Sequence, residues 1–484
     1  MEFTIVLPNT VTNIGDYAFS GCTSLASVSI PEGVKRIWRY AFSDCTSLAS
    51  VSIPEGVTSI DYSAFKGCTS LASVSIPAGV TSIGDYAFSG CKALASVSIP
   101  AGVTSIGEYA FFNCASLAGI SIPAGVTSIG KCAFAGCTSL AGISISAGVT
   151  SIGDSAFSGC KALTSVNIPE GVKNIGKRAF SECTLLESIS IAAGVTRIGE
   201  YAFLGCVSLA SITLPESVTS IGGGAFIYCQ SIANVHYDGS LEQWIEIKFG
   251  GSDANPCYEG AELYIGGEKI TSITIPASVT SIGEAFARCP SLSNVYYGGN
   301  LEQWLEINLG SSALSPCCNG ADLYIGGEKI TSVTIPASVT MILPGAFKGC
   351  TSVASVSIPS SVTEIGSDAF RGCTSLASVN ISEGVTSISF EAFYGCTSLA
   401  SVSIPSSVTE IGNYAFSDCT SLASVSIPSS VTEIGSCAFS GCTSLASINF
   451  AGTVNEWNAI NKFLEWKNGV PAKKVVCSDG EVSL

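Results

Sequence analysis

Cysteine recurs in this chain at intervals of 23 residues, and this period restricts the fold more than any other feature of the sequence. The interval separates the cysteines from Cys22 to Cys229, and it resumes from Cys350 to Cys442. A fixed period of roughly 20 to 50 residues is typical of solenoids, in which each unit packs only on its neighbours. A length of 484 residues alone would suggest about three globular domains. Because of the repeat, we expect a single stacked array instead.

Residues 68–90, CTSLASVSIPAGVTSIGDYAFSG, represent the repeated unit. Leu71, Val74 and Ile76 alternate with polar residues in a pattern that predicts a short strand with one buried face. Pro77 ends this strand because proline lacks the N–H that ladder pairing requires. The first half of each unit is thus predicted to add one strand to a sheet.

The second half of the unit predicts another extended run and then a bend. Residues 80–83 (VTSI) have apolar ends and are expected to form a second short strand, which a turn at Gly84 follows. Residues 85–88 (DYAF) are expected to form a helical or 3₁₀ bend. No unit can bury its apolar side chains alone, so at least three stacked units are needed to build a core.

Phenylalanine forms a second column with the same period. An alanine precedes every member, and this small side chain leaves room for the ring of the next unit. We interpret the column as a structural spine. Its members are Phe19, Phe42, Phe65, Phe88, Phe111, Phe134, Phe157, Phe180, Phe203, Phe226, Phe286, Phe347, Phe370, Phe393, Phe416 and Phe439.

The unit C-x-S-L-x-S-V-x-I-P-x-x-V-T-x-I-G-x-x-A-F-x-G resembles the 23-residue leucine-rich repeat of the BspA-like, or treponemal-type, family. The resemblance extends over most of the chain. It implies a leucine-rich repeat solenoid, β-rich within the α+β class, right-handed and curved, with about 16 repeats.

Two related inserts interrupt the period after Cys229. Their sequences contain SLEQWIEI and NLEQWLEI, and Leu241, Trp244 and Ile245 have the i, i+3, i+4 spacing of a short amphipathic helix. Each insert also contains LYIGGEKI, in which the Gly-Gly pair predicts a tight β-hairpin. Trp304 and Trp457 occupy the position of Trp244 in the second insert and in a shortened third copy at the end of the chain.

The inserts divide the chain into four predicted regions. Residues 1–232 form a first repeat array, 233–345 carry the two inserted modules, 346–447 form a second array, and 448–484 form a capping module. The opening strand, residues 3–7 (FTIVL), has no dedicated cap. Because an exposed apolar end is unfavourable in a solenoid, we expect it to pair with a further domain or with another copy.

Most of the 22 cysteines belong to the repeat column, and we interpret them as buried free thiols. Neighbours in such a column lie about 4.8 Å apart with parallel Cβ vectors, whereas a disulfide needs Cβ atoms about 3.8 Å apart that face each other. Cys257 and Cys317 lie outside the column at equivalent insert positions, which leaves a disulfide between the inserts as an alternative.

The composition excludes several classes of function. Only 12% of residues are charged, and the net charge of −16 argues against a nucleic-acid partner and against docking to anionic lipid. No apolar run is long enough to insert into a membrane, and the first residues show neither a signal peptide nor an anchor. A cytoplasmic location therefore remains open from the sequence.

The sequence also lacks a recognisable catalytic or metal-binding constellation. His236 is the single histidine, so no histidine-based metal site or repeated acid–base pair can form. Neither a nucleophile elbow nor a phosphate-binding loop is present. We predict no enzymatic activity, no cofactor and no metal.

The residues that differ most between repeats lie just before each Ala-Phe pair, and they form the candidate binding edge. In the second repeat, Trp38 and Arg39 make this edge locally basic and aromatic, unlike the edge of the other repeats. Exposed aromatic residues with a polar tip suit contacts with proteins or glycans, although solvated variation along a loop edge would explain the same pattern. The tyrosines of the predicted edge are Tyr17, Tyr40, Tyr86, Tyr109, Tyr201 and Tyr414.

The family resemblance implies an adhesin-type, protein-binding scaffold at the cell surface or in secreted form. Its partners would be proteins or glycans of a host or of neighbouring cells. An alternative is a structural protein that associates with itself, as a dimer or filament, through the uncapped end. Fold alone does not decide between these functions.

Overall fold

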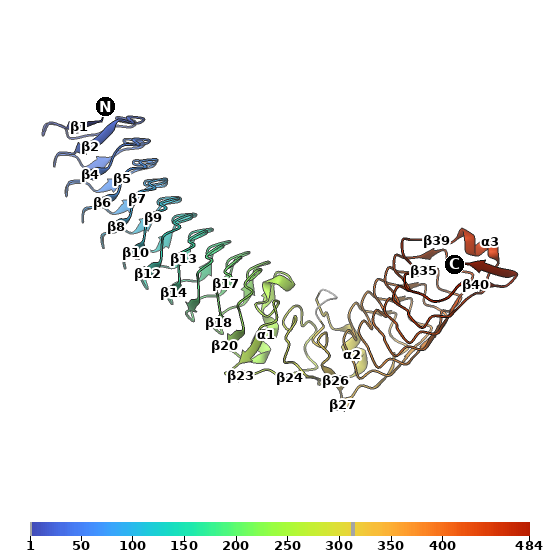
Figure 1. The fold of residues 1–484 in the computed structure, drawn as a ribbon. Helices are drawn as coiled ribbons and strands as arrows, with labels where there is room; N and C mark the ends of the chain where they lie inside the picture. Colours follow the sequence, from blue (N-terminus) through green and yellow to red (C-terminus); the bar gives the residue numbers. More distant parts are fainter. Residues whose placement is uncertain (1, 311–314) are drawn as a thin grey trace. The chain divides into compact units, whose positions relative to one another are not determined.

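The computed structural model describes residues 2–310 and 315–484, which form two compact units, Met1–Lys269 and Ile270–Leu484. The boundary between the units lies inside the predicted region of the two inserts. Within each unit, successive turns of the chain stack so that equivalent strands lie side by side (Figure 1). The chain is a β-rich leucine-rich repeat solenoid of about 20 turns, because the inserts contribute turns in addition to the predicted repeats.

The first strands of the repeats of unit 1, up to residue 191, join a parallel nine-stranded sheet. Its strands pair at the repeat period, so that Val51, Val74 and Val97 occupy the same register position and point into the core. The strands are β1 (Phe3–Val6), β2 (Leu25–Ser29), β4 (Ser50–Ser52), β6 (Ser73–Ser75), β8 (Ser96–Ser98), β10 (Gly119–Ile122), β12 (Gly142–Ile145), β14 (Ser165–Ile168) and β16 (Ser188–Ile191).

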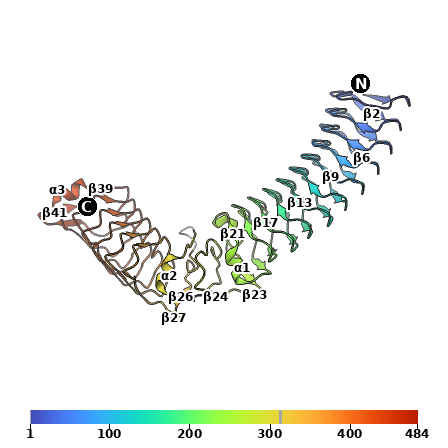
Figure 2. The ribbon, with the colours of Figure 1, turned by 180° about the vertical axis from the view of Figure 1, so that it is seen from behind.

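The second strand of each repeat joins a parallel ten-stranded sheet of two-residue strands. In Figure 2 these short strands follow one another along unit 1, from one turn to the next. The second residue of each strand is a buried isoleucine, except for the half-buried Phe249 of the last strand, whereas the first residue is half-buried or exposed. The strands are β3 (Arg36–Ile37), β5 (Ser59–Ile60), β7 (Ser82–Ile83), β9 (Ser105–Ile106), β11 (Ser128–Ile129), β13 (Ser151–Ile152), β15 (Asn174–Ile175), β17 (Arg197–Ile198), β19 (Ser220–Ile221) and β21 (Lys248–Phe249).

The first insert contains the predicted helix and the predicted hairpin. Ser240 and Gln243 form a reciprocal capping box at the start of helix α1 (Leu241–Glu246). The hairpin turn places Gly266 and Gly267 at φ values of 58° and 85°, as a type I′ turn requires. Strands β18 (Ser211–Leu214), β20 (Asn234–Tyr237), β22 (Glu262–Ile265) and β23 (Glu268–Lys269) form one sheet, and a short 3₁₀ helix, η1 (Ser252–Ala254), follows β21.

Unit 2 begins with one ordinary repeat, and the second insert then repeats the architecture of the first. Its first sheet ends at the antiparallel strand of the hairpin, and the strands that follow in the sequence form a separate sheet. The repeat strand is β24 (Ser272–Ile275), and the elements of the second insert are β25 (Asn294–Tyr297), α2 (Leu301–Glu306), β26 (Asp322–Ile325) and β27 (Glu328–Lys329).

The rest of unit 2 is a second repeat array that ends in the predicted third module. The long strands are β28 (Ser332–Thr334), β30 (Ser355–Ile358), β32 (Ser378–Ile381), β34 (Ser401–Ser403), β36 (Ser424–Ile427) and β38 (Ser447–Phe450). The short strands are β29 (Met341–Ile342), β31 (Glu364–Ile365), β33 (Ser387–Ile388), β35 (Glu410–Ile411), β37 (Glu433–Ile434) and β39 (Asn461–Lys462). The third module consists of α3 (Val454–Ala459) and the hairpin β40 (Lys474–Cys477) and β41 (Gly480–Ser483).

Stacked phenylalanine rings form the spine of both units, as predicted. From Phe19 to Phe226 and from Phe347 to Phe439, successive ring centroids lie 5.2 to 5.6 Å apart with nearly parallel planes. The alanine before each inner ring, such as Ala87, is fully buried. Aromatic pairs at this separation add to the stability that burial of the rings supplies.

The predicted helical or 3₁₀ bend before each phenylalanine is wrong. Tyr86 has a φ of 58°, in the left-handed region, and the segment is a series of turns. The backbone N–H groups of Tyr86 and Phe88 donate to the carbonyls of Glu108 and Ala110 in the next repeat. Within the segment there are single turns, such as the one closed by the hydrogen bond from the N–H of Ala87 to the carbonyl of Gly84, while the bonds to the next repeat engage N–H groups that a continuous helix would use within itself.

The column cysteines are free thiols, and all of them are buried as predicted except Cys22, which is half-buried; all 22 cysteines are unpaired by disulfides. In most repeats the thiol donates a hydrogen bond to the carbonyl of the phenylalanine 26 residues earlier, for example from Cys68 to Phe42 at 3.1 Å. Cys257 and Cys317 are both free thiols, so no disulfide joins the two inserts.

Candidate functional site

Five tyrosines of unit 1 form a continuous row on the predicted binding edge, and we call them the tyrosine row. The centroid separations are 4.6 Å for Tyr17–Tyr40, 5.3 Å for Tyr40–Tyr62, 5.5 Å for Tyr62–Tyr86 and 4.7 Å for Tyr86–Tyr109. Four of these residues were expected from the repeat pattern, and the structure brings them together.

Tyr62 is the member that sequence reasoning missed. It lies one position earlier in its repeat than the others, and Ser63 holds the left-handed backbone position with a φ of 54°. The ring of Tyr62 nevertheless spans the gap between Tyr40 and Tyr86, at interplanar angles of 61° and 53°. A search for tyrosine at either of the two positions before Ala-Phe would have found it.

Stacking determines which part of each tyrosine a partner can reach. Tyr17 and Tyr40 stack within 9° of parallel and Tyr86 and Tyr109 within 5°, so these rings cover one another's faces. The ring edges and hydroxyl groups remain accessible, and Tyr17 is 59% exposed. The row therefore presents a narrow apolar strip with polar tips, a surface that suits contacts with a protein.

Hydrogen bonds between side chains hold some of these phenols in their neutral form. The hydrogen bond with Tyr40 raises the pKa of Tyr62, and a hydrogen bond with the Cys132 thiol raises the pKa of Tyr109. These shifts widen the alkaline pH range over which the hydroxyl groups of Tyr62 and Tyr109 keep their protons.

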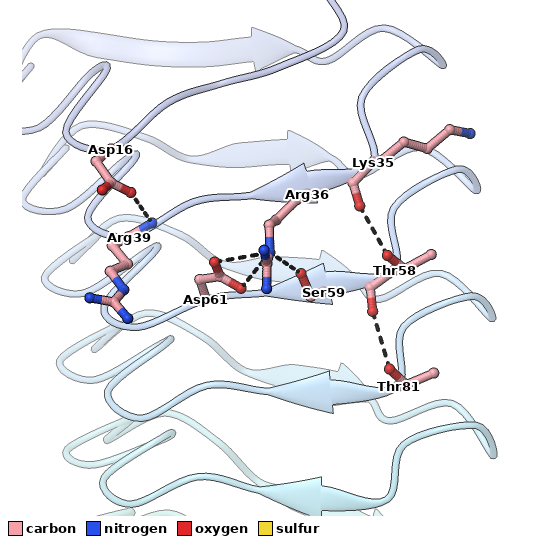
Figure 3. Close-up of polar contacts among 8 residues, drawn as sticks. All are labelled: Asp16, Lys35, Arg36, Arg39, Thr58, Ser59, Asp61 and Thr81. Atoms are coloured by element: carbon pink, nitrogen blue, oxygen red, sulfur yellow. Dashed lines mark hydrogen bonds and ion pairs between the residues drawn. The ribbon is translucent and has the colours of Figure 1, made fainter.

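Trp38 lies beside the tyrosine row in a different environment. The Arg36 guanidinium lies 4.8 Å from the Trp38 ring centroid, and its Nε donates to Ser59 Oγ at 2.9 Å. The same nitrogen forms an ion pair with Asp61 at 3.1 Å (Figure 3). Trp38 and Asp61 occupy positions where most repeats have glycine, so these side chains fill a space that is open elsewhere.

Arg39 is an exposed cation of this region whose side chain forms no ion pair within the described residues. Its backbone N–H donates to Asp16 Oδ1 at 3.1 Å, whereas its side chain extends away from the contacts drawn in Figure 3. The carboxylate of Asp85 accepts the N–H of Glu108 in the same way, at 2.8 Å. Asp16 and Asp85 therefore have a structural role, whereas the side chain of Arg39 is free to reach a partner.

Threonines beside the short strands are also engaged between repeats. Thr58 Oγ1 donates to the carbonyl of Lys35 at 3.2 Å, and Thr81 Oγ1 donates to that of Thr58 at 3.5 Å (Figure 3). This side-chain ladder runs parallel to the strand ladder and stabilises the outer surface of the array.

Two tyrosines of the predicted edge lie apart from the row. The ring of Tyr201 contacts the guanidinium of Arg178, 5.1 Å from its centroid. Tyr414 belongs to unit 2 and contacts Phe390 at 6.0 Å. These residues share the repeat position of the tyrosine row without joining it.

The three insert tryptophans are core residues of their modules. Trp244, Trp304 and Trp457 are at most 2% exposed, and Trp304 Nε1 donates to the carbonyl of Ala346 at 3.0 Å. Their equivalent positions in the three modules thus reflect packing in the core, and these side chains offer no surface to a partner.

The equivalent edge of unit 2 carries a charged network that the sequence did not indicate. Asp368 is 3% exposed and accepts from Lys348 Nζ at 2.7 Å. Arg371 pairs with both Asp368 and Glu391, and its guanidinium lies 4.6 Å from the ring centroid of Tyr394. The repeat position that carries tyrosine in the tyrosine row of unit 1 thus carries the carboxylates of Asp368 and Glu391 in two repeats of unit 2.

The remaining candidates for chemistry are structural residues. His236 lies in strand β20 with its ring stacked on Tyr264 at 4.7 Å. Across residues 2–310 and 315–484, no three side chains of histidine, cysteine, aspartate or glutamate are grouped to hold a metal ion. The helices within these residues are too short and too polar to cross a membrane.

Comparison with known families matches this chain to the BspA-type leucine-rich repeat region. The matches cover residues 3–118, 104–233, 260–326 and 320–446, which together are most of the chain. No curated protein matches the sequence.

Solved structures of bacterial leucine-rich repeat proteins are similar to this chain. A protein from Bacteroides ovatus is 25% identical over 99% of this chain and 93% of its own, with a TM-score of 0.44. A leucine-rich cell surface protein from Faecalibacterium prausnitzii is 30% identical over 81% of this chain and 90% of its own, with a TM-score of 0.35. The leucine-rich repeat protein of Treponema pallidum is 35% identical over 34% of this chain and 78% of its own, with a TM-score of 0.32.

Proposed function

The chain belongs to the BspA-type leucine-rich repeat family, and from this premise we propose that it is a non-enzymatic scaffold that binds a protein through the tyrosine row. The observation that carries the proposal is the continuous stack from Tyr17 to Tyr109. Ordering five aromatic side chains before a partner arrives reduces the entropy that binding must offset. Tyrosine is also among the residues that contribute most to interface energies.

Two features beside the row add to its suitability. Arg39 supplies an exposed cation next to Tyr40, and Lys66 Nζ lies 5.7 Å from the ring centroid of Tyr86. A partner with apolar residues flanked by carboxylates would complement this strip. We further propose a location at the cell surface or in secreted form, where an adhesin would meet such a partner.

The test is a binding measurement with a matched control. The double variant Tyr40→Asn/Tyr86→Asn removes two rings, and asparagine tolerates the left-handed backbone at these positions. The control is Tyr201→Asn, which has the same backbone conformation outside the row. Surface plasmon resonance against immobilised extracellular-matrix proteins, such as collagen and laminin, would supply the affinities.

We expect the wild-type protein to bind at least one such protein, the double variant to lose at least tenfold in affinity, and the control to keep it. Absence of binding to the whole panel at micromolar concentration would contradict the proposal. An equal loss in the double variant and in the control would show that the row is not the contact surface.

Self-association is a second candidate, and strand β1 favours it. Phe3 and Val6 of this strand are 45% and 74% exposed, and an exposed apolar edge can pair with another chain. A Val6→Lys variant would then be monomeric at concentrations where the wild-type protein dimerises. Light scattering of both proteins over a wide concentration range decides this question, and a strictly monomeric wild-type protein excludes the candidate.

A further inference from the structure

A hollow of about 700 Å³ lies on the outer side of the short-strand sheet in unit 1, over β15, β17, β19 and β21. A second hollow of about 530 Å³ lies between this sheet and helix α1. Arg197, Ser220 and Lys248 line both hollows, so the two form one trough divided by this row of side chains. The trough is separate from the tyrosine row and from the function proposed for it.

Glycines create the floor of the trough. Each short strand here is followed by glycine, and a Cβ added at Gly199 would lie 2.6 Å from the backbone nitrogen of Lys177. A Cβ at Gly222 would lie 2.4 Å from the nitrogen of Glu200. The close approach of neighbouring turns thus excludes side chains from the floor. Trp38 and Asp61 fill the corresponding space near the other end of unit 1.

One wall of the trough is a regular row of polar side chains. Asn174, Arg197, Ser220 and Lys248 are direct register partners on successive strands, so they repeat at about 4.8 Å. Within the described part of the chain, neither Arg197 nor Lys248 forms an ion pair. Both cations are exposed and available to a ligand.

The charges around the trough nearly balance. On the opposite wall, Lys177 pairs with Glu200 at 2.6 Å, and this contact lowers the pKa of Glu200. Glu216 and Glu246 line the hollow beneath α1, on the other side of Arg197 and Lys248. The site therefore offers hydrogen-bond donors and acceptors in similar numbers. Such a balance suits neither a polyanion nor a polycation. It does suit a ligand rich in hydroxyl groups, because each hydroxyl group both donates and accepts a hydrogen bond.

The backbone of the floor is not available to a ligand. The N–H groups of Gly176, Gly199 and Gly222 donate to carbonyls of the preceding repeat at 2.8 to 3.0 Å. A peptide lying across the strands could therefore not add to the floor through main-chain hydrogen bonds. Its side chains on one face would also repeat at about 6.8 Å, which does not match the spacing of the wall.

We propose that this trough binds a linear, hydroxyl-rich polysaccharide whose chain runs across the strands of the short sheet. A diequatorially linked pyranose chain advances by close to one strand spacing per sugar, so that each sugar would face one turn of the solenoid. Arg197, Ser220 and Lys248 would hydrogen-bond to its hydroxyl groups. The half-buried ring of Phe249 lines the end of the trough and provides an apolar surface for a sugar face.

The experiment is calorimetric titration of the full chain with soluble cello-oligosaccharides and chitin oligosaccharides as neutral probes, hyaluronan as an acidic probe, and polyglutamate as a peptide probe. The double variant Arg197→Ala/Lys248→Ala removes two wall donors, and Ser220→Trp fills the trough from an outward-facing position. Arg36→Ala is the matched control, since Arg36 holds the same repeat position where Trp38 and Asp61 close the space. Circular dichroism verifies that each variant is folded.

We expect at least one neutral oligosaccharide to bind, both trough variants to weaken that binding at least tenfold, and Arg36→Ala to leave it unchanged. The tyrosine-row variant Tyr40→Asn/Tyr86→Asn should also leave it unchanged, which separates this result from a failure of the proposed protein-binding function. The proposal is overturned if no neutral oligosaccharide binds, if only hyaluronan or only polyglutamate binds, or if the control loses as much affinity as the trough variants.

Discussion

The thiol of Cys91 donates a hydrogen bond to the carbonyl oxygen of Phe65, 26 residues earlier, at 3.2 Å. This contact links the cysteine column to the phenylalanine spine across a repeat boundary. Burial raises the pKa of the Cys91 thiol to about 12, although the hydrogen bond from the backbone of Cys68 acts in the opposite direction. The same arrangement recurs in most repeats of both units.

The first prediction concerns the reactivity of the thiols. Only the thiolate is nucleophilic, so buried thiols with raised pKa values should not react in the folded protein. We expect brief treatment with iodoacetamide at pH 8 to modify at most the four half-buried cysteines, Cys22, Cys132, Cys318 and Cys437. Peptide mass spectrometry identifies the modified sites, and rapid labelling of Cys91 would contradict the structure.

The second prediction concerns stability at alkaline pH. Cys91 and Cys137 have pKa values near 12 in the folded protein against an ordinary value of 9.0. Between pH 9 and 12 the unfolded chain loses these protons while the folded chain keeps them, so the free energy of unfolding must fall as the pH rises. Urea unfolding at pH 8, 9 and 10 measures the decline.

Cys91→Ala serves as the control for this decline. Removing one thiol should lower the proton release on unfolding above pH 9 by up to one proton per molecule. A pH dependence identical to that of the wild-type protein would show that Cys91 does not contribute.

The third prediction tests the spine. Phe134 is fully buried, and its ring centroid lies 5.3 Å from that of Phe111 and 5.4 Å from that of Phe157. Phe134→Ala should cost about 3–5 kcal/mol because no neighbouring group can fill the space. Hydrogen exchange should show the loss of protection concentrated in the adjoining repeats. Phe390→Ala is the control, since Phe390 is 43% exposed and should cost less than about 1 kcal/mol.

The fourth prediction tests the left-handed backbone. Ser155 has a φ of 54°, whereas Gly224 occupies the same repeat position at 66°. Ser155→Gly should stabilise the protein by up to about 1 kcal/mol, because glycine avoids the cost of a Cβ in this conformation. Ser158→Gly, three residues later and outside the left-handed region, should destabilise it by about 0.5–1 kcal/mol. Thermal unfolding of both variants shows directly whether each substitution raises or lowers the melting temperature.

The columns that build the stack could be predicted from the sequence because burial imposes the same residue type in every repeat. Cys68, Val74 and Phe88 are buried in the predicted way. The inserts were predictable for a similar reason, since the Gly-Gly pair permits few turns and Trp244 marks the apolar side of a helix. In each case, local chemistry and the repeat period lead to the same conclusion.

The candidate sites were less predictable because they depend on contacts between turns. The position of Tyr62 breaks the repeat pattern, yet its ring joins the tyrosine row through space. The bend before Phe88 suggested a helix, whereas hydrogen bonds to the next turn hold Tyr86 in a left-handed conformation. The trough exists only where the side chains of the neighbouring turns leave Gly199 uncovered. The sequence of a single repeat does not show which side chains its neighbouring turns carry.

Hydrogen bonds between repeats in this protein have fixed separations along the chain, such as 23 residues between Thr81 and Thr104. A deletion of one whole repeat would therefore leave every remaining bond with a suitable partner, whereas most shorter deletions would displace all the columns at once. Recombination between repeats can thus lengthen or shorten the array in whole steps. The surface that the array presents to its environment can vary in extent over evolution while each new copy inherits a complete set of contacts.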